Sequence, residues 1–105
     1  MDSGVQGGRV PPHNLEAERS VLGALLMHND SLHRVQEIGL EPRDFYRDAH
    51  QKIFDVVINQ IGRGEPVDLV TLTNALRDRG LYEAVGGQAT LTGLLEDAFA
   101  AGNIG

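Results

Sequence analysis

Four histidines give this 105-residue chain its widest chemical range, because imidazole can bind metals and transfer protons. They occupy positions 13, 28, 33 and 50, and no two have the four-residue spacing that places two imidazoles on one helix face. The zinc motif H-E-x-x-H is absent. Asp44 and Asp48 are four residues apart, but we expect a turn between them. The sequence therefore predicts no metal site.

His50 is the most informative of the four, since it falls on the apolar face of a predicted helix, one turn before Phe54. It could act as a general base or a buried pH switch. It could also be a histidine at the edge of the core, with its nitrogens bonded to a backbone carbonyl and a nearby side chain. No serine or carboxylate motif marks a partner, so we favour the structural role and predict no catalytic residue.

Phosphate binding is the second chemistry to test, and the sequence argues against it. A P-loop needs G-x-x-x-x-G-K-[ST], but Lys52 is the only lysine and belongs to a predicted helix. Gly86-Gly87 lacks the spacing of a dinucleotide-binding loop and is better explained as a turn. The chain has no cysteine, which excludes disulfides and thiolate sites. We therefore predict no cofactor-binding residue.

Charge narrows the classes of partner. Nine basic and fifteen acidic residues give a net charge of −6, and no basic residue follows Arg79. This balance disfavours an electrostatic nucleic-acid binder and makes the second half suited to a basic protein partner. No apolar run reaches the roughly 18–20 residues of a membrane span, and the first residues lack the pattern of a secretion signal. We expect a soluble intracellular protein without a membrane partner.

The elements that must position these residues are predicted to be helices. Apolar residues recur at helical spacing, and no segment reads convincingly as a strand. The fold class is therefore predicted to be all-α, a compact bundle of five or six short helices. The domain organisation is a flexible leader, a helical domain and the start of a link to further structure. The predicted segments are 1–12, 13–100 and 101–105, with helices beginning at Asn14, Ser31, Asp48, Asp68 and Gln88 and the last ending near Ala100.

Several residues are assigned to helix ends and to the core. Asn14 and Asp68 are predicted N-caps, and either Asp30 or Ser31 is expected to cap the second helix. Gly39 is its expected terminator. The aromatic side chains of Phe45 and Tyr46 are both expected to fill the core.

Four phrases, in order along the chain, resemble one family. They are residues 11–23 (PPHNLEAERSVLG), Asp44-Phe45-Tyr46-Arg47 with Ala49-His50 and Ile53-Phe54, residues 64–72 (GEPVDLVTL), and residues 81–91 with Val85-Gly86-Gly87. Together they resemble the N-terminal domain of the bacterial replicative helicase, the DnaB family. Two departures stand out. Residues 97–103 lack the proline of the family's approach to its hairpin, and Asp48 replaces a proline that many members have, where it is expected to cap the helix instead.

The resemblance implies that this sequence is one domain of a longer, multidomain protein. The family's full chain adds a helical hairpin and a RecA-like motor domain, which would hold ATP and Mg, contact DNA and drive unwinding. This sequence resembles the first part only, so we expect no catalysis from it. It would form part of a collar of dimers or hexamers that helps dock primase and a helicase loader, in the cytoplasm of a bacterium at the replication fork.

Phe99, Asn103 and Ile104 are the candidate interface residues, since an apolar end of this kind should pack on the hairpin or on a neighbouring subunit. The alternative is a free-standing helical adaptor or regulator without a motor. A longer reading frame that encodes G-x-x-x-x-G-K-[ST] downstream would decide between the two.

Overall fold

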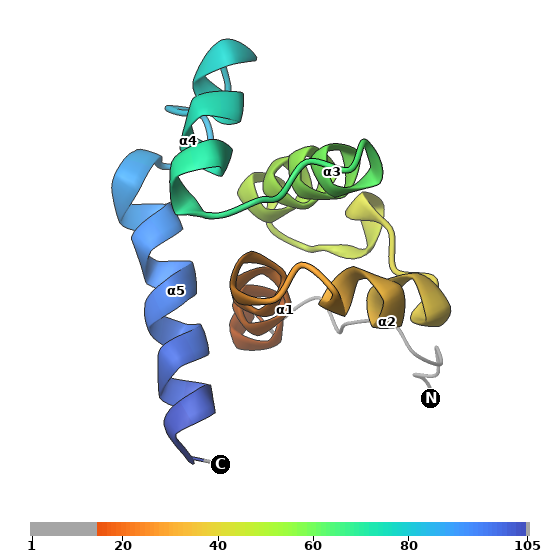
Figure 1. The fold of residues 1–105 in the computed structure, drawn as a ribbon. Helices are drawn as coiled ribbons and strands as arrows, with labels where there is room; N and C mark the ends of the chain where they lie inside the picture. Colours follow the sequence, from red (N-terminus) through yellow and green to blue (C-terminus); the bar gives the residue numbers. More distant parts are fainter. Residues whose placement is uncertain (1–14, 105) are drawn as a thin grey trace, which may run out of the picture.

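The computed structural model describes the backbone of residues 15–104 and the side chains of residues 15–96 (Figure 1). Within residues 15–104 there is no strand, so the predicted all-α class is confirmed. The elements are α1 (Leu15–Met27), α2 (Ser31–Ile38), the 3-10 turn η2 (Pro42–Asp44), α3 (Asp48–Gly62), α4 (Leu69–Asp78) and α5 (Gly87–Ile104).

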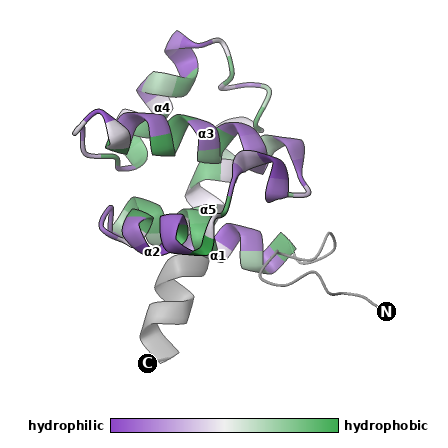
Figure 2. Ribbon diagram, turned by 90° about the vertical axis from the view of Figure 1, so that its right-hand side faces the viewer, coloured by the Kyte–Doolittle hydropathy of each residue, from purple (hydrophilic) through white to green (hydrophobic). Residues whose placement is uncertain are grey.

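The helix α1 is the centre of the arrangement. It packs chiefly along α5 and also contacts α3 and α2, while α4 contacts both α3 and α5 (Figure 1). Figure 2 shows hydrophilic and hydrophobic residues alternating along the helices, as amphipathic helices around one core require. Every α-helix contributes to that core, whose largest fully buried apolar side chains are Phe45, Phe54, Leu22, Leu25, Ile53, Leu72, Leu76, Leu91 and Leu94.

The helix α3 is buried over most of its length, as its apolar periodicity predicts. Ile53, Phe54 and Val57 are fully buried, and Val56 widens the buried face. The ring of Phe54 lies against the ring of Phe45, with 4.8 Å between the centroids. This aromatic pair fixes η2 against α3, so the turn before the helix is part of the core.

Tyr46 corrects one prediction. Phe45 is 1% exposed and fills the core as expected, but the neighbouring Tyr46 is 60% exposed. The backbone of Phe45 is extended (φ −83°, ψ 138°), and successive side chains of an extended segment point to opposite sides. Two consecutive aromatics could not both enter the core from this backbone.

Two further predictions, that Asp30 and Asp48 cap helices with their side chains, are wrong. Asp30 makes no side-chain capping bond because its own backbone is already helical (φ −61°, ψ −19°), whereas a capping residue is normally extended. Asp48 does not cap α3 either, since Arg47 occupies that position. Asp48 instead lies in the first turn and forms an ion pair with Lys52. Gly39, with φ 81°, ends α2 in the left-handed conformation as predicted.

The helix α5 is longer than predicted, since it continues to Ile104 rather than ending near Ala100. No proline interrupts residues 97–103, and alanine-rich segments favour helix. The leader 1–12 and the expected cap Asn14 lie outside the described residues. Among residues 15–104, no helix combines the length and apolar character needed to cross a membrane.

The predicted cap at Asp68 is confirmed and provides a first test. Its carboxylate accepts a hydrogen bond from the Thr71 backbone N–H (2.9 Å), and the Asp68 backbone N–H donates to the Thr71 hydroxyl oxygen (2.8 Å). Asp68→Ala is expected to lower the free energy of unfolding by about 1 kcal/mol in a urea titration, because this amide loses its partner. The control Asp78→Ala, at the other end of α4, should change it by less than about 0.5 kcal/mol. Equal losses would contradict the capping role.

Candidate functional site

A buried carboxylate–imidazole pair is the most polar feature of the interior. Glu18 is 0% exposed on α1, and His50 is 3% exposed on α3. The Glu18 Oε1 atom lies 2.7 Å from Nδ1 of His50, across 32 positions of sequence. The pair therefore joins the first and third helices at the heart of the fold.

Two backbone amides complete the surroundings of the Glu18 carboxylate. The Tyr46 N–H donates to Oε2, and the Arg47 N–H donates to Oε1 over 3.4 Å. The two backbone N–H groups can only donate, so both oxygens of the Glu18 carboxylate act as hydrogen-bond acceptors. The His50 proton that faces Glu18 is accordingly assigned to Nδ1. Glu18 thus holds α1, α3 and the segment that joins η2 to α3.

The arrangement fits a structural contact that holds α1 and α3 together better than it fits a reaction centre. Both side chains are sealed from solvent, and within the described residues no group of three potential ligands surrounds a metal position. A catalytic base must reach a substrate, and this pair has no such access. Of the two partners expected for a structural His50, the described contacts give the side-chain one, Glu18, and its role stays a prediction.

The partner of His50 is what sequence reasoning missed. Glu18 lies in the first turn of α1, where an acidic residue is commonly explained by the positive end of the helix dipole alone. A signal was present: Glu18 precedes Leu22 by four residues and Leu25 by seven, so it shares their buried face. A carboxylate on an apolar stripe requires a buried partner.

Asn29 forms a second polar junction that the sequence did not reveal. Its side-chain amide donates to the backbone carbonyls of Leu25 (2.8 Å) and Val67 (2.9 Å). Its carbonyl accepts from the Val67 N–H at 2.8 Å. One side chain therefore ties the end of α1 to the loop before α4, which is 38 residues away in sequence.

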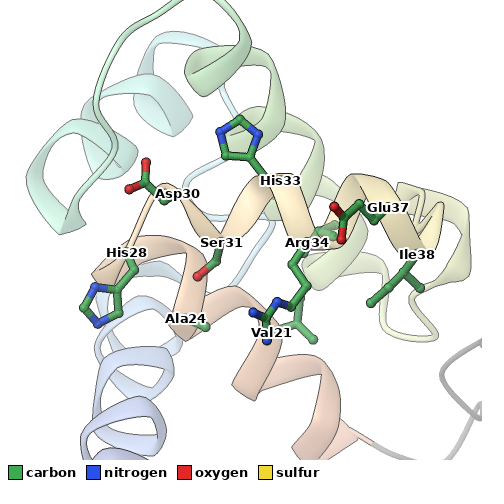
Figure 3. A pocket seen from close by; sticks show the side chains of 10 residues that line it. Val21, Ala24, His28, Asp30, Ser31, His33, Arg34, Glu37 and Ile38 are labelled. Carbon is green, nitrogen blue, oxygen red and sulfur yellow. The ribbon is translucent and has the colours of Figure 1, made fainter.

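An open groove of about 740 Å³ separates α1 from α2 (Figure 3). Apolar side chains of Val21, Ala24 and Val35 form part of its lining, and Arg34 and Glu37 bring both signs of charge. Figure 3 shows Arg34 extending from α2 across toward Val21 of α1. This groove is open to solvent, whereas the Glu18–His50 pair is buried. The groove is therefore the better candidate for contact with a partner.

Comparison with known proteins decides the family. Residues 10–105 match the model of the DnaB-like helicase N terminal domain. The chain belongs to this family. The recognition made from the four ordered phrases is thereby confirmed.

Relatives of known sequence agree with the family assignment. The chain is 46% identical over 96 residues to the replicative DNA helicase DnaC of Bacillus subtilis, covering 91% of this chain and 21% of that protein. It is 44% identical over 98 residues to the replicative DNA helicase DnaB of Mycobacterium leprae, covering 93% and 16% respectively. The chain thus spans about a fifth or less of the length of these relatives.

A solved structure supports the fold. The crystal structure of the N-terminal domain of DnaB helicase from Mycobacterium tuberculosis superposes with a TM-score of 0.78 at 44% identity. The match covers 84% of this chain and 63% of that one. The all-α architecture is therefore that of a DnaB N-terminal domain.

The residues predicted to form the interface of this DnaB-like domain are Phe99, Asn103 and Ile104. They belong to the last turns of α5, whose backbone is helical, but their side chains lie outside the described residues. Their role stays a prediction.

Proposed function

We propose that this chain is the non-catalytic N-terminal domain of a replicative DNA helicase and supports assembly of its hexamer and docking of primase. The observation that carries the proposal is the family match over residues 10–105. ATP-driven unwinding, with ATP and Mg, would belong to a C-terminal motor domain, through which the protein would also contact DNA. Its place would be the cytoplasm of a bacterium, at the replication fork.

The chemistry of the described residues suits this division of work. The buried pair of Glu18 and His50 is closed to substrates, and the sequence contains no P-loop. A net charge of −6 disfavours direct contact with a phosphate backbone. A small helical domain with these properties acts by contacting other proteins.

The experiment compares the full-length protein with a version that lacks residues 1–105. We expect both to hydrolyse ATP, and we expect the shortened protein to form fewer hexamers in mass photometry and to respond less to primase in an unwinding assay. The 105-residue chain alone should show no DNA-stimulated ATP hydrolysis.

Two results would contradict the proposal. One is measurable DNA-stimulated ATPase activity of the 105-residue chain. The other is a shortened protein that forms hexamers and responds to primase as well as the full-length protein does. A gene without a downstream G-x-x-x-x-G-K-[ST] motif would favour the free-standing adaptor instead.

A further inference from the structure

The outer side of α4 presents three different side chains in one row. Val70, Asn74 and Arg77 are all exposed, and Val70, at 66%, is among the most exposed large apolar residues that the structure describes. Steps of four and three residues place the three on one side of the helix, which we call the α4 face. Leu72 and Leu76, on the opposite side, are buried where α4 contacts α3 and α5 (Figure 1). The α4 face is therefore turned away from the core.

The guanidinium group of Arg77 is held in place by an aromatic ring. Its central carbon lies 4.3 Å from the centroid of the Tyr82 ring. The ring is fixed in turn, since its hydroxyl donates to Oε1 of Gln88 over 3.2 Å. A guanidinium that stacks on a ring keeps N–H donors free for a ligand. Because Arg77 is already oriented, it loses little conformational freedom when it binds one.

The polar side chains of the α4 face have no polar partner within the described part of the chain. Arg77 forms no ion pair there, although Asp78 and Glu83 follow it closely in the sequence, and the Asn74 amide forms no hydrogen bond there. A carboxylate matches the fork of a guanidinium with two parallel hydrogen bonds. An exposed apolar residue beside such a group is typical of a contact surface, where arginine and tyrosine often contribute much of the binding energy.

We propose that the α4 face binds an amphipathic helix of another protein, which pairs a carboxylate with Arg77 and packs an apolar side chain on Val70. Asn74 lies between them and binds a polar group of the partner helix. Val70 and Arg77 are seven residues apart, which is about 10.5 Å along the helix axis. A helix laid alongside α4 therefore presents its apolar and acidic residues two turns apart.

Charge selects this partner over a nucleic acid or a basic protein. Asp78 and Glu83 are exposed and flank the Arg77–Tyr82 pair in the sequence, and the whole chain carries a net charge of −6. The closely spaced phosphates of a nucleic acid would meet these like charges. A helix with a single carboxylate places its one negative charge on Arg77 alone. A basic partner would be repelled by Arg77.

The test is selection of peptides from a library of α-helical sequences displayed on phage, with the 105-residue chain as bait. Counter-selection on the Arg77→Glu variant removes peptides that bind elsewhere on the chain. The remaining peptides are expected to carry Asp or Glu two turns from an apolar residue. The proposal does not depend on the helicase assignment, since bait and peptides are used without any motor domain.

Calorimetry on one selected peptide, at about 0.15 M salt, then measures the contact. Arg77→Glu should weaken binding about ten-fold, and Arg77→Lys about three-fold, because lysine keeps the charge but lacks the fork. Arg79→Glu is the matched control: Arg79 is exposed two residues further on and lies outside the α4 face, so binding should stay within about two-fold.

A charge exchange separates direct contact from a structural role. Replacing the acidic residue of the peptide by lysine should abolish binding to the wild-type chain and restore it, to within about three-fold, on the Arg77→Glu variant. Tyr82 acts as a positioning residue, so Tyr82→Leu should weaken binding of the original peptide about three-fold. Tyr82→Phe keeps the ring under the guanidinium and should recover most of this loss.

Three outcomes would overturn the proposal. No peptide could survive the counter-selection, or the surviving peptides could lack a carboxylate, or the lysine peptide could fail to bind the Arg77→Glu variant. Binding of single-stranded DNA to the wild-type chain that is lost in Arg77→Glu would assign the α4 face to a nucleic acid instead. Circular dichroism of each variant must show wild-type helix content. If Arg77→Glu does not fold, Arg77→Gln replaces it in the counter-selection and Arg77→Lys provides the affinity comparison.

Discussion

Glu18→Ala is expected to lower the free energy of unfolding by about 3–5 kcal/mol, the range found when one member of a buried pair is removed. The substitution leaves Nδ1 of His50, which is buried, and the Tyr46 N–H, which is partly buried, without the Glu18 acceptor. Such donors pay the full cost of leaving water. Urea titration followed by circular dichroism measures the loss. Because a domain of this size is stable by only about 5–15 kcal/mol, the variant will be close to unfolding.

The control is Glu16→Ala. Glu16 is two residues away on the same helix but is exposed, so its removal should change the free energy of unfolding by less than about 0.5 kcal/mol. If Glu18→Ala does not fold, a more conservative variant still allows the contribution of Glu18 to be measured. Glu18→Gln retains one carbonyl acceptor and turns an NH₂ group toward donors, and should cost about 1–3 kcal/mol.

A double-mutant cycle isolates the pair itself. If the Glu18–His50 contact stabilises the fold, then Glu18→Ala combined with His50→Ala should cost less than the sum of the single variants, by at least about 1 kcal/mol. Additive losses of unfolding free energy, or a loss for Glu18→Ala as small as that for Glu16→Ala, would show that the Glu18–His50 contact does not stabilise the fold.

The helices could be predicted from the sequence because their signals are local. Apolar residues in α3 repeat at helical spacing, Gly39 favours the left-handed turn that ends α2, and Asp68 precedes an apolar run at the spacing of a cap. Each of these depends on neighbours within about one or two turns, which a single sequence displays.

The polar junctions could not be predicted in the same way. His50 lies 32 positions from Glu18 and Val67 lies 38 positions from Asn29, so no spacing rule connects these pairs. The sequence could indicate that Glu18 is buried, but only the packing of α1 against α3 determines that His50 receives its bond. The groove between α1 and α2 likewise depends on how the two helices pack.

Phe45 and Tyr46 provide the second large expected effect, because they are adjacent aromatics with opposite surroundings. Phe45→Ala should lower the free energy of unfolding by about 3–5 kcal/mol, since it removes a buried ring that packs on Phe54 and leaves a cavity. Tyr46→Ala should cost less than about 1 kcal/mol, because the side chain is largely exposed and its backbone N–H still binds Glu18.

Comparing the two variants separates the stability contributed by the buried Phe45 ring from that contributed by the backbone of this segment. Both substitutions replace an aromatic residue by alanine in the same segment, so any general loosening of this segment would appear equally in both. Phe45→Leu restores most of the apolar volume and should recover more than half of the loss in urea titration. Losses of similar size at the two positions would mean that the segment's backbone, and not the Phe45–Phe54 contact, determines stability. The unequal result would instead show that the buried Phe45–Phe54 contact, and not the exposed neighbouring ring, stabilises this segment.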